Sequence, residues 1–314
     1  MKLKKVKINR ITTENNLFLA PLAGFSDFAM RSICLSFGAS LAFTEMVSCK
    51  GLIYGNLNTE DLLFTTDDEK IKCAQVFGND PTIMRKAVEL PSMEKFDIVD
   101  VNFGCPMPKI FNNGEGSALL DKPELAEKII SELKKTGKII TAKIRIGILT
   151  GKPLAVDFAK ALEQGGADMI TVHGRAKDKI YAGEVDYDTI AEVKRAVNIP
   201  VIANGGIFSA NDADKMIKNT DADGVMLARG ALEKPWLFAE IRGEKVNISK
   251  KQIIRKHIEK LLTRYDDEVV AVNFRKQICL YLKGEPNSAA LKEKIFALKN
   301  TRDILAAVDD FFAS

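Results

Sequence analysis

Eight short apolar runs recur along the chain, and stretches of helical periodicity lie between most of them. Each run is rich in Val, Ile, Leu and Ala, which favours a buried strand. The expected strands are residues 17–20, 41–45, 71–76, 98–101, 139–144, 169–172, 201–203 and 224–227. The expected helices include residues 123–135, 157–163, 187–197 and 210–218. Eight alternations of strand and helix predict a closed parallel (β/α)8 TIM barrel. No Gly-x-Gly-x-x-Gly follows an early strand, which argues against an open dinucleotide-binding sheet.

The pattern changes after Trp236. Residues 242–251 are polar and poor in strand formers, and the chain beyond them has helical periodicity. The amphipathic stretches are residues 252–265, 269–282 and 291–312, with a break at residues 284–287. We therefore expect a barrel domain over residues 1–245 and a small all-helical domain over residues 246–314.

The two predicted domains differ in charge. Residues 1–241 contain 31 Lys and Arg against 32 Asp and Glu, whereas residues 242–314 contain 15 against 10. The basic excess therefore lies in the helical part, where it could hold a polyanion. A solvated helix face explains the same charge equally well.

Composition excludes several classes of protein. The 314 residues are 46% hydrophobic and 28% charged, and no apolar run approaches the roughly 18 residues of a membrane span. The basic start is followed by a polar segment and Pro21, so we expect no secretory signal and a cytoplasmic protein. Five cysteines without a Cys-x-x-Cys pair and only two histidines argue against a disulfide framework and a metal site.

Residues 97–108 present a cysteine at the end of the fourth expected strand. Gly104 relaxes the backbone before Cys105, and Pro106 and Pro108 stop the loop from continuing as strand or helix. The simplest interpretation is a buried structural cysteine, since free Cys is among the most buried residue types. Its position favours the alternative that the loop displays a reactive thiol.

Polar groups follow the other strands at the same end of the predicted barrel, where barrel enzymes carry their reactive residues. Each of these residues, taken alone, could have a purely structural role. Only their joint placement at one end of the barrel indicates a functional site. The residues are Glu45, Gln75, Asn102, Lys143 with Arg145, His173 with Arg175, Asn204 and Arg229.

The last two strand ends predict a phosphate site. Asn204-Gly205-Gly206, followed by Ser209 as a helix N-cap, and Ala228-Arg229-Gly230 let backbone N–H groups approach an anion. Lys143 places a positive charge near the same cavity, which suits a reduced flavin ring, and Gln75 could bind the ring edge. A phosphate-bearing cofactor is therefore expected.

These residues carry a resemblance to the tRNA-dihydrouridine synthases, an FMN-dependent family, and most of all to its bacterial B-type branch. The match runs almost from end to end. Its motifs are Ala20-Pro21-Leu22-Ala23-Gly24-Phe25-Ser26-Asp27, Asn102-Phe103-Gly104-Cys105-Pro106, Gly116-Ser117-Ala118-Leu119-Leu120, Lys143-Ile144-Arg145-Ile146-Gly147, His173-Gly174-Arg175 and Val201-Ile202-Ala203-Asn204-Gly205.

The resemblance implies a role for each matching residue. The implied FMN contacts are Pro21, Leu22, Ala23, Gln75, Lys143 and His173 at the ring, and Asn204, Gly205, Gly206, Ala228 and Arg229 at the phosphate. Cys105 would be the catalytic acid, Asn102 and Arg175 would lie near the uracil, and Arg275 and Lys276 would contact RNA. NADPH, or NADH, would reduce FMN, and the product would be 5,6-dihydrouridine, with the D-loop of tRNA as the expected place. We expect a monomer without a metal or membrane partner.

Two positions depart from the family pattern. Ala228 stands where Gly is common, which narrows the approach of the backbone to a phosphate, and Gln277 stands where His is common.

Two other functions stay open from the sequence. One is an FMN barrel oxidoreductase that acts on a free pyrimidine or a small enone, and the other is an RNA-binding barrel without chemistry.

Overall fold

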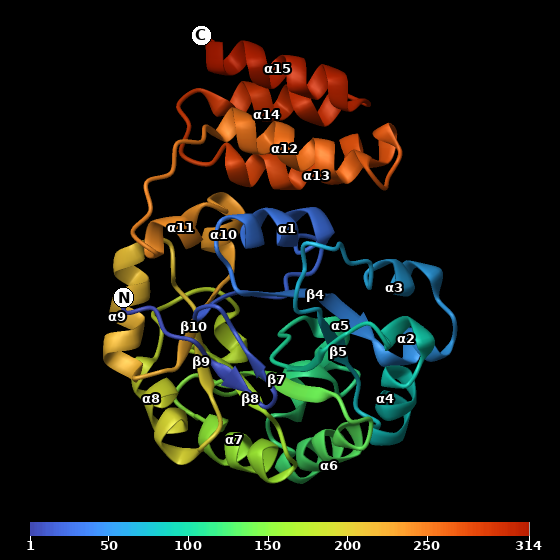
Figure 1. The fold of residues 1–314 in the computed structure, drawn as a ribbon, viewed down its shortest axis with the longest axis vertical. Coiled ribbons are helices and arrows are strands. Elements are labelled where there is room, and N and C mark those ends of the chain that lie inside the picture. The colour runs from blue at the N-terminus through green and yellow to red at the C-terminus, as the bar shows by residue number, and fades with distance from the viewer. Residues whose placement is uncertain (314) are drawn as a thin grey trace.

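Eight parallel strands close into a barrel in the computed structural model, which describes residues 1–313 (Figure 1). The strands are β3 (Leu17–Leu19), β4 (Leu41–Ser48), β5 (Cys73–Phe77), β6 (Ile98–Phe103), β7 (Ile139–Arg145), β8 (Met169–His173), β9 (Val201–Asn204) and β10 (Gly224–Leu227). Pairing of β10 with β3 completes the ring. The prediction of a (β/α)8 barrel is confirmed, and the expected strand ends are within three residues of the observed ones.

Helices surround the barrel and cover its outer face (Figure 1). They are α1 (Phe28–Ser36), α2 (Cys49–Ile53), α3 (Leu57–Asp61), α4 (Pro81–Val88), α5 (Pro108–Phe111), α6 (Pro123–Lys134), α7 (Ala155–Gln164), α8 (Tyr187–Ala196), α9 (Ala210–Thr220), α10 (Arg229–Glu233) and α11 (Leu237–Ile241). Short 3-10 helices lie at η1 (Pro91–Met93), η2 (Gly116–Leu119) and η3 (Lys177–Lys179). Pro123 opens α6, and the Ser209 side chain caps α9 as expected.

Alternate residues of each strand point into the barrel. On β6 and β7, Ile98 and Ile139 belong to an apolar cluster at the amino-terminal end of the barrel. Two residues further along, Asp100 pairs in register with Thr141, and the next inward pair is Asn102 with Lys143. The interior therefore changes from apolar to polar toward the carboxyl ends of the strands.

A short hairpin that the sequence analysis did not predict closes the apolar end. Its strands, β1 (Lys7–Ile8) and β2 (Ile11–Thr12), are antiparallel, and Ile8 is fully buried in the same apolar cluster as Ile98. Two-residue strands are too short to give a periodic signal.

Four helices follow the barrel, where three were predicted. They are α12 (Lys250–Leu262), α13 (Asp267–Tyr281), α14 (Ser288–Ala297) and α15 (Thr301–Ala313). The predicted single helix over residues 291–312 is wrong because the chain is extended at Leu298 and a new helix starts after Asn300, whose side chain accepts a hydrogen bond from the N–H of Asp303 at 2.8 Å. An Asn at this position is a common helix start.

Helix α1 connects the barrel to these four helices, which lie beyond α1, α10 and α11 (Figure 1). Phe28 and Ile33 of α1 share one buried apolar cluster with Ile254 and Ile278 from the helical part.

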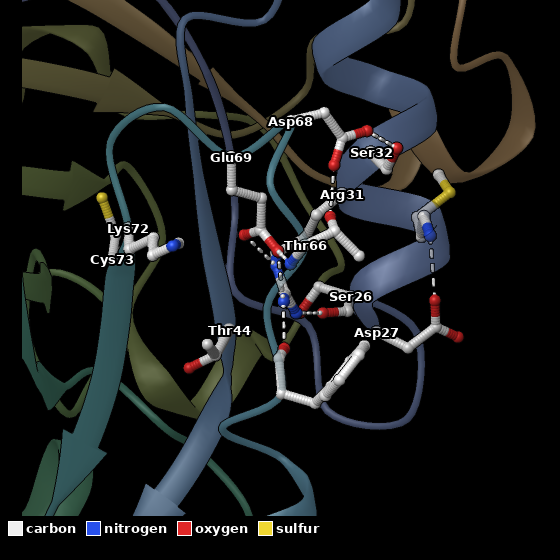
Figure 2. Close-up of polar contacts among 12 residues, drawn as sticks. Ser26, Asp27, Arg31, Ser32, Thr44, Thr66, Asp68, Glu69, Lys72 and Cys73 are labelled. Carbon is white, nitrogen blue, oxygen red and sulfur yellow. Dashed lines mark hydrogen bonds and ion pairs between the residues drawn. The ribbon is translucent and has the colours of Figure 1, made fainter. Parts of the chain in front are cut away.

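On its barrel side, α1 is fixed by Arg31. Figure 2 shows that the Arg31 side chain points toward Glu69, on the loop before β5. The guanidinium donates to the two carboxylate oxygens at 2.8 and 2.9 Å and to the carbonyls of Ser26 and Phe64. Because residues 21–26 lead directly into α1, this buried pair also holds the loop that follows β3.

Candidate active site

One cavity of about 470 Å³ opens at the carboxyl ends of the strands. It brings together the predicted site residues of the barrel except Glu45, whose carboxylate accepts a hydrogen bond from the Gly24 N–H instead. These lining residues are Pro21, Leu22, Ala23, Gln75, Asn102, Cys105, Lys143, His173, Arg175, Asn204, Gly205, Gly206, Ala228 and Arg229. Residues from all parts of the barrel sequence meet here because the parallel strands end on the same side.

The Cys105 loop is held on both sides of the thiol. The Asn102 Oδ1 atom accepts hydrogen bonds from the N–H groups of Gly104 and Cys105 at 3.1 and 2.8 Å. The Cys105 carbonyl accepts from the N–H and hydroxyl of Ser117, and the Gly104 carbonyl accepts from Arg145 Nε at 2.8 Å. Cys105 is 8% exposed, and this small exposure faces the cavity. Cys105 is therefore a mostly buried thiol that borders the cavity.

The surroundings of Cys105 keep the thiol protonated near neutral pH. Burial raises the thiol pKa, and the opposing effects of the Met107 N–H group, Arg145 and Lys143 are smaller. A protonated thiol can donate a proton, whereas a nucleophilic cysteine needs a lowered pKa.

Lys143 and His173 are also shifted by burial. Burial, together with the charge of Arg145, lowers the pKa of Lys143 to about 8 against the opposing effects of Asp100 and Cys105. For His173, burial and then the charges of Lys143, Arg145 and other cations hold the pKa well below its usual value. His173 is therefore a neutral side chain in a cavity of positive potential.

A hydrogen-bonded chain runs beneath the cavity from Thr141 to the Cys105 loop. Asp100 accepts from Thr141 Oγ1 at 2.6 Å and from Gln75 Nε2 at 2.7 Å. Gln75 Oε1 in turn accepts from Asn102 Nδ2 at 2.8 Å. Gln75 and Asn102 therefore line the cavity with their amide groups already fixed by protein partners.

The ends of β9 and β10 form a cradle of exposed backbone in the cavity wall. Gly205 and Gly206 have φ angles of +123° and +68°, where residues with a side chain are strained. A Cβ atom on Gly205 would lie 3.0 Å from the His173 ring. Arg229 lies beside this turn, and Arg175 Nη1 is buried without a hydrogen-bond partner among residues 1–313. An unpaired buried guanidinium nitrogen next to bare backbone suits a phosphate.

Several cavity residues were not among the predicted site residues. Arg145 was expected beside Lys143 at its strand end but received no role, and its spacing of two residues from Lys143 could have identified it as a further inward-facing group. Tyr181 lies on the loop after β8, with Arg229 4.8 Å above its ring, and no periodic signal marks such a residue. Phe25, Met46 and Phe208 add apolar surface.

The two predicted RNA contacts of the helical part lie outside the cavity lining. Lys276 is exposed and lies 5.2 Å from the Phe25 ring, close to the cavity mouth. Arg275 is half-buried and donates to the Leu298 carbonyl, so it joins α13 to the end of α14. Gln277 is buried and donates to the Leu232 carbonyl of α10 at 2.9 Å, which attaches α13 to the barrel. Of these residues, Lys276 is the one placed to meet a ligand outside the protein.

Residues 1–313 contain no group of three His, Cys, Asp or Glu side chains suited to a metal ion. All five cysteines are free thiols. None of the helices described is long and apolar enough to cross a membrane.

The closed barrel and the functional groups gathered at the carboxyl ends of its strands define the class of this protein, a (β/α)8-barrel enzyme. Comparison with known proteins identifies the family. The sequence model of the Dihydrouridine synthase (Dus) family matches residues 18–314. A probable tRNA-dihydrouridine synthase from Helicobacter pylori is 34% identical over 94% of this chain and 92% of its own. The tRNA-dihydrouridine synthase B of Pasteurella multocida is 33% identical over 98% of this chain and 96% of its own.

The chain therefore belongs to the dihydrouridine synthase family and is an oxidoreductase, and the resemblance seen in the sequence is confirmed. Among solved structures, TcOYE in complex with pHBA has a TM-score of 0.57 at 13% identity and covers 77% of this chain and 92% of its own. A 6-hydroxypseudooxynicotine amine oxidase from Pseudomonas geniculata has a TM-score of 0.56 at 14% identity, over 76% of this chain and 49% of its own. Both similarities concern the fold alone.

Proposed function

We propose that this protein reduces a uridine of tRNA, in the D-loop, to 5,6-dihydrouridine, with FMN as the bound cofactor and NADPH as the reductant. NADH could replace NADPH. Family membership supports the reaction. The observation that carries the proposal is that the Cys105 thiol opens into the same cavity as Lys143 and the cradle around Gly205 and Arg229.

The residues of the cavity fit FMN. Asn204, Gly205, Gly206, Ala228 and Arg229 would hold the phosphate, and the unpaired Arg175 Nη1 would remain free to meet the uracil. Ala228, at the position where Gly is common in the family, also lines this cavity.

The opposite part of the cavity suits the flavin ring. Pro21, Leu22 and Ala23 provide a surface that Arg31 holds in place through Ser26. Gln75, Lys143 and His173 offer polar groups to the ring edge. When bound and reduced, FMN would supply a hydride for C6 of the uracil, and these residues would hold its ring.

Cys105 supplies the second hydrogen. As the C5=C6 double bond is lost and C6 gains a hydride, C5 takes the proton of the Cys105 thiol, and solvent returns a proton to the sulfur. Asn102 would position the uracil beside this thiol, with Arg175 nearby. The target base would have to leave its stack to enter the cavity.

The helical part would hold the tRNA outside the cavity. We propose that residues 1–245 form the catalytic domain and residues 246–314 a tRNA-binding domain, with phosphate contacts from the basic excess. Lys276 would contribute at the mouth of the cavity, and Arg275 would contribute through the α13–α14 junction that it stabilises. We expect the protein to act as a cytoplasmic monomer.

The experiment that tests the proposal offers two substrates to one preparation. Purified protein is loaded with FMN, supplied with NADPH, and incubated with unmodified tRNA or with free uridine. Formation of dihydrouridine in tRNA alone supports the proposal. Reduction of free uridine at a similar rate would favour a small-molecule oxidoreductase, and protein that takes up no FMN would favour an RNA-binding protein.

A further inference from the structure

Asp100 is a charged residue with no exposed surface, and it lies inside the barrel beneath the cavity. It belongs to β6, two residues before Asn102, and does not line the cavity. A carboxylate in such a position is costly to bury unless its oxygens accept hydrogen bonds. Both oxygens do, one from Thr141 and one from Gln75. No role for this carboxylate follows from the reaction itself.

The chemistry of the carboxylate determines the direction of the hydrogen bonds that follow. An ionised carboxylate only accepts, so the Gln75 amide must turn its NH₂ group toward Asp100. The Gln75 oxygen then faces Asn102, which must offer its own NH₂ group. This leaves Asn102 Oδ1 on the other side, where it accepts from the N–H groups of Gly104 and Cys105.

We infer that Asp100 is a positioning residue, which fixes the orientation of the Gln75 and Asn102 amides and thereby holds the Cys105 loop in place. In a protein without this carboxylate, the orientation of the two amides depends on the backbone N–H groups of Gly104 and Cys105 alone, at the far end of the chain from Gln75. A reversed Asn102 would turn its NH₂ group toward the two backbone donors and would no longer hold the loop.

The orientation also determines what the cavity offers a ligand. Each NH₂ group has two hydrogens, and one hydrogen of each is used within the chain. The remaining hydrogen of Asn102 points near the Met46 sulfur, 3.6 Å from the nitrogen, which is a weak acceptor. Both amides therefore present donors, which match carbonyl oxygens. This part of the inference rests on the proposed function, because it requires carbonyl groups of FMN or uracil in the cavity.

The charges around Asp100 keep it ionised near neutral pH. Burial raises the pKa of Asp100 to about 6, against the hydrogen bonds of Thr141 and Gln75 and the charge of Lys143. The titratable groups that face it are Lys143 on β7 and the Cys73 thiol on β5. The carboxylate is therefore an acceptor under the conditions in which the enzyme would work.

The test compares D100L with D100N and with T141V. Leu removes both acceptors, Asn keeps one oxygen for Gln75 and can donate to the Thr141 hydroxyl, and T141V removes the other partner of Asp100 without touching the chain to Cys105. The first measurement is the rate at which Cys105 is alkylated by N-ethylmaleimide, read by peptide mass spectrometry in protein without FMN. The second is the dissociation constant of FMN.

We expect D100L to raise the alkylation rate and to weaken FMN binding, each by about tenfold. D100N and T141V should stay within about threefold of the wild type. Equal values for D100L and T141V, or no change in D100L, would overturn the inference. If D100L does not fold by circular dichroism, D100S replaces it, because a serine hydroxyl is too short to reach Gln75. The alkylation rate needs neither FMN nor tRNA, so it tests the inference even if the proposed function fails.

Discussion

The side-chain oxygen of Asn102 accepts the backbone N–H of Cys105 at 2.8 Å. Asn102, the second-last residue of strand β6, thus holds the loop that follows the strand. Since the same amide bonds Gln75 on β5, the thiol is tied to two neighbouring strands of the barrel. A proton donor needs this kind of fixed placement, because proton transfer requires a short and defined distance to the reacting carbon.

Replacing Cys105 with Ala should remove the proton donor to C5 of the uracil while NADPH still reduces FMN. We expect C105A to bind FMN and to be reduced by NADPH at rates near those of the wild type, whereas dihydrouridine formation falls by about 10² to 10⁴. Stopped-flow absorbance follows the flavin, and nucleoside mass spectrometry measures the product. C279A, which changes a half-exposed thiol on α13, is the control. Turnover of C105A near the control would remove Cys105 as the acid.

Replacing Arg229 with Ala should weaken FMN binding through its phosphate. A charge-assisted hydrogen bond is worth about 1.5–3 kcal/mol, so the dissociation constant of FMN should rise by about 10 to 100-fold. Riboflavin, which has no phosphate, should bind R229A and wild type alike. R195A, an exposed arginine on α8, is the control. A loss of affinity equal for FMN and riboflavin would contradict the phosphate role.

Lys276 should contribute to tRNA binding through its charge. We expect K276A to weaken tRNA binding at low salt and to lower the slope of log Kd against log salt by about one unit, with FMN affinity unchanged. Filter binding over a salt series provides the measurement. K160A on α7, which lies on the side of the barrel away from the helical part (Figure 1), is the matched control. Identical salt slopes for the two variants would argue against contact with RNA.

The buried Arg31–Glu69 pair should contribute far more to the free energy of unfolding than the exposed Lys70–Glu14 pair. R31M leaves Glu69 buried and unpaired, which should lower the free energy of unfolding by about 3–5 kcal/mol. K70M removes the pair with Glu14, whose side chains are 80% and 74% exposed, and should cost no more than about 1 kcal/mol. Urea denaturation measures both. Similar losses in the two variants would show that the buried pair does not hold α1.

The difference in stability between wild type and D100N should change with pH only between pH 3.8 and about 6. Folding raises the pKa of Asp100 from 3.8 to about 6, so its contribution to stability is complete below pH 3.8 and is lost as the pH rises through about 6. D100N does not titrate. The free energy of unfolding of D100N, relative to that of wild type, should therefore increase by up to about 3 kcal/mol between these pH values and stay constant above them. Denaturation curves that run in parallel across the window would contradict a raised pKa.

The barrel and most of its site were predictable because both follow from strand periodicity. Once eight parallel strands are placed, their ends must meet, and Lys143 and Asn204 fall into one cavity without any further information. The helical part was less predictable, because the side on which Gln277 packs depends on α10, which is distant in sequence. Tyr181 was missed for a related reason, since its loop is held by Arg145 through the Ile180 carbonyl rather than by its own sequence.

The central claim is that a thiol and a bound flavin act together on a uridine of tRNA. The most direct measurement is mass spectrometry of nucleosides from unmodified tRNA that has been incubated with NADPH and with FMN-loaded wild type, C105A or C279A. We expect dihydrouridine to form in the tRNA with wild type and C279A, and its rate of formation to fall by about 10² to 10⁴ with C105A, whose flavin NADPH still reduces. No dihydrouridine from wild type whose flavin is reduced, or full product from C105A, would contradict the claim.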